Sequence, residues 1–229
     1  MKTALTEKLT FRPPPPGCVL SLPGLPGGGS KLFDRSPYGN PGTVNGATWQ
    51  RLQSGICPLS FDGVDDYIDC GNNNAFNATG DFTIEAWLKV NNPAASVAQG
   101  IAWKKAANAF TAANGWGAYV QQGQLYINYG KVGGGYQDKG VPFTSTQWTH
   151  IAVGKCGGSV FWIYNGVPSP IQTVTGNPEV NSVSLLLGKI GGTNLLTGMM
   201  AYPRIHRRAL SPLEARRHFD AEKELFGVW

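Results

Sequence analysis

Aromatic and amide side chains gather in one stretch of the sequence, between positions 99 and 137. A set of five suits sugar binding, namely Trp103, Trp116, Tyr119, Tyr126 and Asn128. Sugar rings stack on exposed aromatic faces, and asparagine amides hydrogen-bond to their hydroxyl groups. The interior of a β-sandwich uses the same ring types, and core filling is the more common role of such rings. The sequence therefore leaves two interpretations open, an exposed glycan site and a packed interior.

Carboxylates and histidines give little support for catalysis. The acidic residues Asp62, Asp65, Asp66 and Asp69 lie around a predicted turn, where aspartate suits the backbone. Glu85 stands alone on a predicted strand, and no serine or cysteine partner is indicated for the three histidines. We therefore expect a non-catalytic protein.

The four cysteines exclude two kinds of site, because no CxxC pair is present for a zinc ribbon or a thioredoxin-type redox centre. In a hairpin predicted over residues 57–70, Cys57 falls opposite Cys70, close enough for a disulfide. Two buried thiols are the alternative, and they suit a reducing cytosol better. Cys18 and Cys156 are predicted to be free thiols in the core.

Short strands must position these residues. The clearest covers residues 82–90, where apolar side chains alternate with Thr83, Glu85, Trp87 and Lys89. Other strands are predicted at 19–22, 101–104, 116–121, 124–129, 148–155, 159–164, 183–188 and 198–206. Residues 23–48 are rich in Gly, Pro, Ser and Asn, which predicts a long loop with little regular structure.

One helix is predicted, and it closes the chain. Ser211 is its expected N-cap, Pro212 takes the first helical position, and Glu214 completes a capping box. The helix should run to about Leu225, before Gly227. Many short strands with frequent turns and a single helix predict an all-β sandwich or barrel.

Composition and charge exclude several further classes of protein. Charged residues make up only 14% of the chain, which disfavours disorder and coiled coils. No apolar run approaches the roughly 20 residues that span a membrane. The net charge of +5 is mild, and we expect no nucleic-acid partner, because the basic residues near the C-terminus are balanced by acidic neighbours on the predicted helix.

Several motifs, in order, resemble a known family. They are Asp34 to Thr43 (DRSPYGNPGT), Gly46 to Trp49 (GATW), Leu59 to Ile68 (LSFDGVDDYI), Asp81 to Trp87 (DFTIEAW), Gln147 to Val153 (QWTHIAV), Phe161 to Gly166 (FWIYNG) and Leu210 to Glu214 (LSPLE). Together they resemble the LamG-like, concanavalin A-like jelly-roll domains, which include laminin G and pentraxin-type sandwiches. The resemblance covers roughly residues 18–220 and leaves a Pro-rich arm, 1–17, and a tail, 221–229, outside it.

The resemblance implies an all-β fold, a two-sheet antiparallel jelly-roll sandwich of the concanavalin A-like type with one short C-terminal helix. Members mostly bind glycans, proteins or calcium, and fold alone does not choose among these. Asp34, Asn40 and Asp62 fall in the loops that would hold a calcium ion, although turn capping explains the same residues. Glycosidases of this fold carry a Glu-x-Asp-x-x-Glu strand, and this sequence has no such run.

The two ends of the chain suggest assembly. The N-terminus has a positive start but no apolar segment of the kind a secretory signal needs, so we expect synthesis in the cytoplasm without a recognisable signal peptide. A virion or another extracellular assembly fits a lectin-like domain made in that way. The residues expected to contact neighbouring subunits are Phe11, Arg12, Pro13, Pro14, Pro15 and Pro16 of the arm and Phe226 and Trp229 of the tail.

The sequence thus predicts a structural or adhesion module. It would be a phage capsid decoration or tail/fibre protein, or a comparable component, that cements homo- or hetero-oligomeric subunits and binds surface glycans, with calcium as the only cofactor considered. The alternative is a free-standing carbohydrate-binding module of a cell-surface or exported protein.

Overall fold

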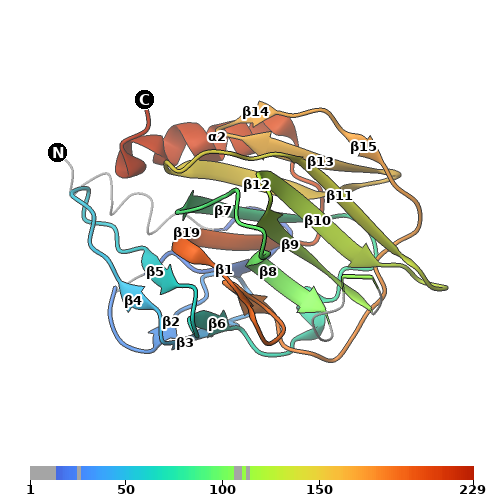
Figure 1. The fold of residues 1–229 in the computed structure, drawn as a ribbon, viewed down its shortest axis with the longest axis horizontal. Helices are drawn as coiled ribbons and strands as arrows, with labels where there is room; N and C mark the ends of the chain where they lie inside the picture. The colour runs from blue at the N-terminus through green and yellow to red at the C-terminus, as the bar shows by residue number, and fades with distance from the viewer. Residues whose placement is uncertain (1–13, 25–26, 106–109, 112–113) are drawn as a thin grey trace.

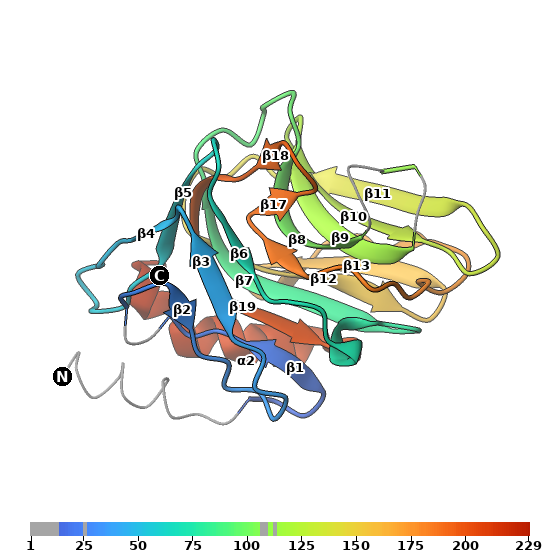
Figure 2. The ribbon, with the colours of Figure 1, turned by 90° about the horizontal axis from the view of Figure 1, so that it is seen from below.

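The computed structural model describes residues 14–24, 27–105, 110–111 and 114–229. These residues form two antiparallel sheets packed face to face, with one α-helix on the outside of the first sheet (Figures 1 and 2). This architecture confirms the predicted all-β jelly-roll sandwich.

The first sheet contains nine strands among the described residues, in the order β14-β13-β12-β7-β19-β5-β4, with β1 paired to β19 and β15 paired to β13. Their bounds are β1 (Cys18–Ser21), β4 (Thr48–Trp49), β5 (Leu59–Asp62), β7 (Phe82–Val90), β12 (Thr149–Cys156), β13 (Ser159–Tyr164), β14 (Val167–Pro168), β15 (Gln172–Thr173) and β19 (Thr197–His206).

The second sheet has the order β11-β10-β9-β8-β16-β6-β3-β2. Its strands are β2 (Lys31–Leu32), β3 (Gly42–Asn45), β6 (Tyr67–Asp69), β8 (Gln99–Lys105), β9 (Gly115–Gln121), β10 (Gln124–Gly130), β11 (Tyr136–Pro142) and β16 (Leu186–Leu187). A small ribbon of β17 (Lys189–Ile190) and β18 (Asn194–Leu195) and a 3-10 turn, η1 (Asn74–Phe76), complete this side.

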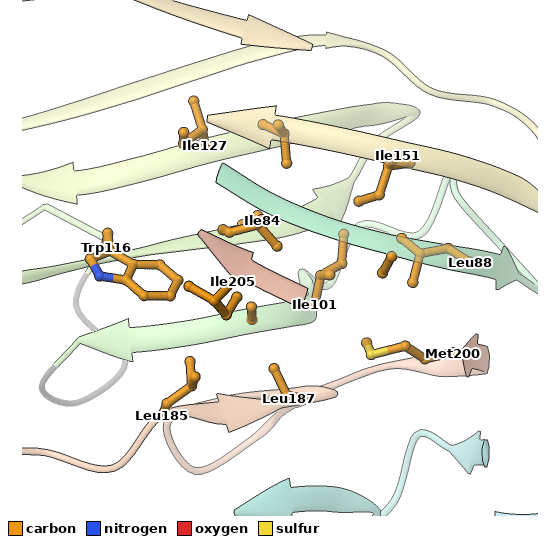
Figure 3. Close-up of a cluster of buried hydrophobic side chains, with 14 of the residues drawn as sticks. Ile84, Leu88, Ile101, Trp116, Ile127, Ile151, Leu185, Leu187, Met200 and Ile205 are labelled. Carbon is orange, nitrogen blue, oxygen red and sulfur yellow. The ribbon is translucent and has the colours of Figure 1, made fainter. Parts of the chain in front are cut away.

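The core lies between the two sheets. Figure 3 shows buried side chains from both sheets in this core, among them Ile84 and Leu88 of β7, Ile101 of β8 and Ile127 of β10. Alternation along β7 sends one set of side chains into this core. The opposite set is buried as well, because the C-terminal helix covers that face and Trp87 packs there. This double burial explains why almost every residue of β7 is inaccessible.

The helix α2 (Pro212–Glu222) begins as predicted. The Ser211 hydroxyl accepts a hydrogen bond from the Glu214 amide, and the Glu214 carboxylate accepts one from the Ser211 amide. A 3-10 turn, η2 (Lys223–Phe226), follows directly and carries the chain to Gly227. This reciprocal cap satisfies two of the amide groups that a helix start leaves unpaired.

Two predictions about local structure are wrong, the hairpin over 57–70 and the irregular loop over 23–48. The predicted hairpin over 57–70 does not form, because β5 pairs with β4 and β19 in the first sheet whereas β6 pairs with β3 and β16 in the second. Both strands send their apolar residues into the same core from opposite sides. Residues 23–48 contain the short strands β2 and β3 and the first residue of β4 in place of a wholly irregular loop.

Candidate functional site

Four of the five predicted sugar-binding residues share one face of the second sheet. Trp103 and Tyr119 lie on β8 and β9, and Tyr126 and Asn128 lie on β10. Tyr126 is directly opposite Tyr119, and Asn128 is directly opposite Asp138 of β11. Opposite residues in antiparallel strands point to the same side. We call this side, which faces away from the core, the β8–β11 outer face.

The rings of the β8–β11 outer face lie against one another. Tyr119 and Tyr126 stack with centroids 4.8 Å apart and an interplanar angle of 7°. Phe110 packs edge-on over Trp103 at 5.6 Å and over Tyr119 at 4.9 Å. The rings approach the backbone closely where glycine provides room. A Cβ on Gly117 would stand 2.1 Å from the Trp103 ring.

Polar groups lie beside these rings. The Lys105 ammonium nitrogen is 2.5 Å from Asn128 Oδ1, and Asn128 Nδ2 donates to the Phe110 carbonyl at 2.9 Å. The Tyr119 hydroxyl lies 3.0 and 2.9 Å from the two Asp138 carboxylate oxygens. Burial lowers the pKa of Lys105 to about 8, and burial raises the pKa of Asp138 above its ordinary value.

Exposure divides the five predicted residues. Trp116 points into the sandwich core, where its indole N–H donates to the Phe76 carbonyl at 2.8 Å (Figure 3). It lies on the opposite face from Tyr119 because the two are three residues apart on one strand. Trp103 and Tyr119 are only 1% and 2% exposed, and Asn128 is fully buried, whereas Tyr126 is half-buried. Of the two interpretations left open, a packed interior describes Trp116, whereas Phe110 and Ile190 pack with Trp103 and Tyr119 on the outer face.

The predicted calcium residues lie in two separate places. Asp34 accepts hydrogen bonds from the amides of Ser21, Ser36 and Asn40 at 2.8 Å each, and from the Ser36 hydroxyl. Its carboxylate therefore closes a loop, and the Asn40 side chain extends the same network toward Val19.

Asp62 instead lies with Asp65 and Asp66, whose carboxylates come within 4.8 Å of its own. The Asp62 amide donates to Asp66 at 2.8 Å, and the Asp62 side chain accepts from the Val64 amide at 2.7 Å, as expected of a turn.

Glu85 and all three histidines form a cluster that the sequence analysis missed. Glu85 is fully buried on β7, between the first sheet and α2. The distances to its carboxylate are 2.9 Å from His150 Nε2, 3.1 Å from His206 Nε2 and 2.7 Å from His218 Nδ1. A carboxylate only accepts hydrogen bonds, so each of these ring nitrogens is the donor. Glu85 thus joins β12, β19 and α2 to β7.

Arg204 completes this buried cluster. Its guanidinium is 3.4 Å from the Glu85 carboxylate and pairs with Glu222 of α2. Burial raises the pKa of Glu85, but Arg204 and the three histidine hydrogen bonds outweigh it and hold that pKa well below the ordinary value. Glu222 also accepts a hydrogen bond from the Trp87 indole at 2.8 Å. In the sequence, the only indication of this cluster was the placement of Glu85 on the side of strand 82–90 opposite its apolar residues.

The expected assembly residues have different environments. Phe11, Arg12 and Pro13 lie outside the described residues. Pro14, Pro15 and Pro16 lie at the surface of the domain, where Arg208 Nε donates to the Pro16 carbonyl at 2.7 Å. Phe226 stacks on Trp87 with centroids 4.1 Å apart and is buried in its own domain. Trp229 is 89% exposed.

The cysteines are all free. Cys57 and Cys70 are unbridged, and the hairpin that would have paired them is absent because their neighbouring strands belong to different sheets. Cys18 is buried as predicted, whereas Cys156 is exposed at the end of β12, which corrects the expectation of a core thiol.

Two packed antiparallel sheets with a short closing helix define a jelly-roll β-sandwich. A profile of the concanavalin A-like lectin/glucanases superfamily, Laminin_G_3, matches residues 62–216. The chain therefore belongs to this superfamily, as the motifs implied. No curated protein matches the chain. Among the described residues, no helix has the length and apolar character needed to cross a membrane.

Solved structures share this fold at low sequence identity. The binding domain of Paraclostridial Mosquitocidal Protein 1 aligns with a TM-score of 0.73 and 17% identity, over 98% of this chain and 56% of that one. The binding domain of botulinum neurotoxin DC in complex with rat synaptotagmin II gives 0.71 and 16%, over 90% and 51%. The same domain in complex with SialylT gives 0.70 and 15%, over 90% and 52%. The chain spans about half the length of these structures.

Proposed function

We propose that this chain is a non-catalytic adhesion module that binds surface glycans through the β8–β11 outer face. The superfamily and the fold support a lectin-like binding role. Two of the similar structures are binding domains solved with a partner, one with synaptotagmin II and one with SialylT. Glu85 is the glutamate that was considered for catalysis. It is buried and its carboxylate accepts hydrogen bonds from three histidines, which supports a structural role for it.

The arrangement around Tyr126 carries this proposal. Its half-buried ring is backed by Tyr119 on one side and lies over Gly140, where an added Cβ would come within 2.8 Å of the ring. Tyr136, which is 40% exposed, and the partly buried Asp138 carboxylate lie on the adjoining strand. A rigid ring with a carboxylate nearby matches what a sugar requires, namely an apolar face and a hydroxyl acceptor.

The test is glycan binding by the full chain, screened on an immobilised glycan panel and quantified by calorimetry. Substituting Tyr126→Ala removes a ring contact of about 0.5–1.5 kcal/mol, so affinity should fall roughly 2- to 12-fold. Tyr38→Ala is the matched control, because that ring is 50% exposed in the loop after Asp34, away from the proposed site. Equal losses for both variants, or no glycan bound by the unchanged chain, would contradict the proposal. Repeating the screen with calcium and with a chelator tests the calcium prediction.

We place this module on a virion or another extracellular assembly, with neighbouring subunits as partners. The exposed indole of Trp229 supports a contact there, since it borders a hollow of about 350 Å³ shared with Trp148 and Leu52. The measurement is the mass in solution of the full chain beside a chain without residues 1–17. Assembly of the full chain alone supports the arm as a clamp. Two monomers would favour the free-standing carbohydrate-binding module.

A further inference from the structure

Lys105, Asn128 and Asp138 form a compact triad on three strands of the second sheet. Lys105 ends β8, Asn128 lies on β10, and Asp138 lies directly opposite Asn128 on β11. The Lys105 nitrogen is 2.5 Å from Asn128 Oδ1. With a C=O bond of about 1.23 Å, that nitrogen lies within about 3.7 Å of the amide carbon. This is close to the near-attack separation of about 3–3.5 Å.

Two of the three side chains of the triad are shielded from solvent, and the third, Asp138, is partly buried. Asn128 is fully buried and Lys105 is 3% exposed. Phe110 covers the asparagine and accepts a hydrogen bond from its amide nitrogen. The Asp138 carboxylate contacts both the Asn128 amide and the Tyr119 hydroxyl. Apolar burial of this kind favours the uncharged forms of an amine and a carboxylic acid.

The pKa values of Lys105 and Asp138 suit an attack by the lysine amine on the asparagine amide. Burial lowers the pKa of Lys105 to about 8, so about half of the amine is neutral and nucleophilic at pH 8 and about a tenth at pH 7. Burial also raises the pKa of Asp138, which brings its carboxyl group closer to giving and taking a proton.

We propose that Lys105 and Asn128 form an intramolecular isopeptide bond, with Asp138 as the proton carrier. The neutral Lys105 amine attacks the Asn128 amide carbon, and an N–C bond forms between them. A proton leaves the lysine nitrogen and reaches the amide nitrogen through the Asp138 carboxyl group. The bond from that carbon to Nδ2 then breaks, and one ammonia molecule departs. No oxidant, metal or other reactant is consumed.

Two other lysines in the described part of the chain contact asparagine side chains and provide internal comparisons. Lys104 Nζ lies 2.8 Å from Asn181 Oδ1, and its remaining contacts are amide and backbone oxygens, which cannot relay a proton. Lys155 Nζ lies 2.9 Å from Asn177 Oδ1, and Asp81 is 3.8 Å from that lysine with its side chain 40% exposed. Among the described residues, no carboxyl group is found against the asparagine of either lysine as Asp138 is against Asn128, so we expect both lysines to remain unlinked.

The cross-link would join β8 to β10 across β9 and enclose the segment between residues 105 and 128 in a covalent ring. This role goes beyond glycan binding, since it would hold the sheet together under force or proteolysis whether or not a sugar is bound.

The experiment is mass spectrometry of the full chain, kept folded at pH 8. We expect an intact mass lower by one ammonia, about 17 Da, than the sequence requires. Trypsin should then fail at Lys105, and a second cleavage after Trp116 should leave the two pieces joined. A cyclised asparagine would also lose ammonia, but its two pieces would separate, and that result would overturn the proposal.

Variants test the role of Asp138. Asp138→Ala should slow the ammonia loss at least about a hundredfold, the usual range for a lost proton carrier. Asp81→Asn is the matched control and should react like the unchanged chain. An intact mass equal to the sequence mass would refute the cross-link directly. A link at Lys104 or Lys155, or an undiminished rate in Asp138→Ala, would refute the assignment of the triad.

Discussion

Replacing the buried carboxylate of Glu85 should destabilise the domain more than any surface charge change. In Glu85→Gln, three histidine ring nitrogens and Arg204 lose the anion that they surround. Removing one partner of a buried charge pair costs about 3–5 kcal/mol. For a domain of this size, each 1 kcal/mol lowers the melting temperature by about 2–4 °C, so we expect a decrease of about 6–20 °C.

The same cluster sets the sign of the pH dependence. Burial lowers the pKa of His206 below its ordinary value, more than its hydrogen bond to Glu85 raises it. Below the ordinary histidine pKa of about 6.5, the unfolded chain therefore binds a proton that the folded chain does not. The free energy of unfolding should fall as the pH drops from 7 to 5, by at most about 1.4 kcal/mol per pH unit for this histidine.

The surroundings of His206 explain why its pKa is lowered. Its Nε2 already donates to Glu85, and its Nδ1 has no hydrogen-bond partner among the described residues. A second proton would create a buried, unpaired N–H close to Arg204. Below pH 4.5 the lowered pKa of Glu85 adds to the loss, since the unfolded carboxylate takes up a proton first.

The assay is thermal and urea unfolding between pH 5 and pH 8, followed by tryptophan fluorescence, because Trp87 is buried beside the cluster. Asp220→Asn on the exposed face of α2 is the matched control, and we expect little change from it. The reasoning fails if Glu85→Gln lowers the melting temperature no more than this control. It also fails if the unchanged chain becomes more stable between pH 7 and pH 5.

Three further substitutions test the packing. Phe226→Ala should lower the free energy of unfolding in urea by about 3–5 kcal/mol, because it removes a ring stacked on the buried Trp87 indole. Trp229→Ala should change it little, because that ring is 89% exposed. Similar costs for both variants would contradict the burial pattern. Gly117→Ala should cost about 1–3 kcal/mol, since the new methyl group meets an indole, and Gly28→Ala, with open space around it, should be neutral in the same assay. Asp34→Ala should cost about 1–3 kcal/mol equally with and without calcium, because it leaves backbone amides unpaired; a loss seen only with calcium would indicate a metal ligand.

Local signals in the sequence predicted the elements well. The alternation over 82–90 became β7 with the expected bounds, and the Ser211 capping box formed as written in the sequence. The strand β11 was not predicted, because its seven residues contain a single buried apolar side chain, Val141. An edge strand of this kind has too little apolar alternation to be recognised.

Long-range relations could not be predicted in the same way. Glu85 is separated from its histidine partners by 65, 121 and 133 residues, and only the order of strands in the sheet brings them together. Strands β5 and β6 show the alternation of a hairpin, but the same pattern serves two strands that face one core from opposite sheets. The opposite orientation of Trp116 and Tyr119 could be predicted, because residues three apart on one strand point to opposite faces of the sheet.

Lys104 has a consequence for the loops around it. Its fully buried ammonium group lies within 3.3 Å of oxygens from Asn72, Asn181 and Val183, which belong to segments distant in sequence. Oxygen atoms gathered around a positive charge are the arrangement that a calcium ion would otherwise organise. Here the cation is covalently part of the chain. Chelators and dilution cannot remove it. Burial lowers the pKa of Lys104 to about 8, so below that pH this corner of the sandwich should keep its shape in media where a dissociable ion would be lost.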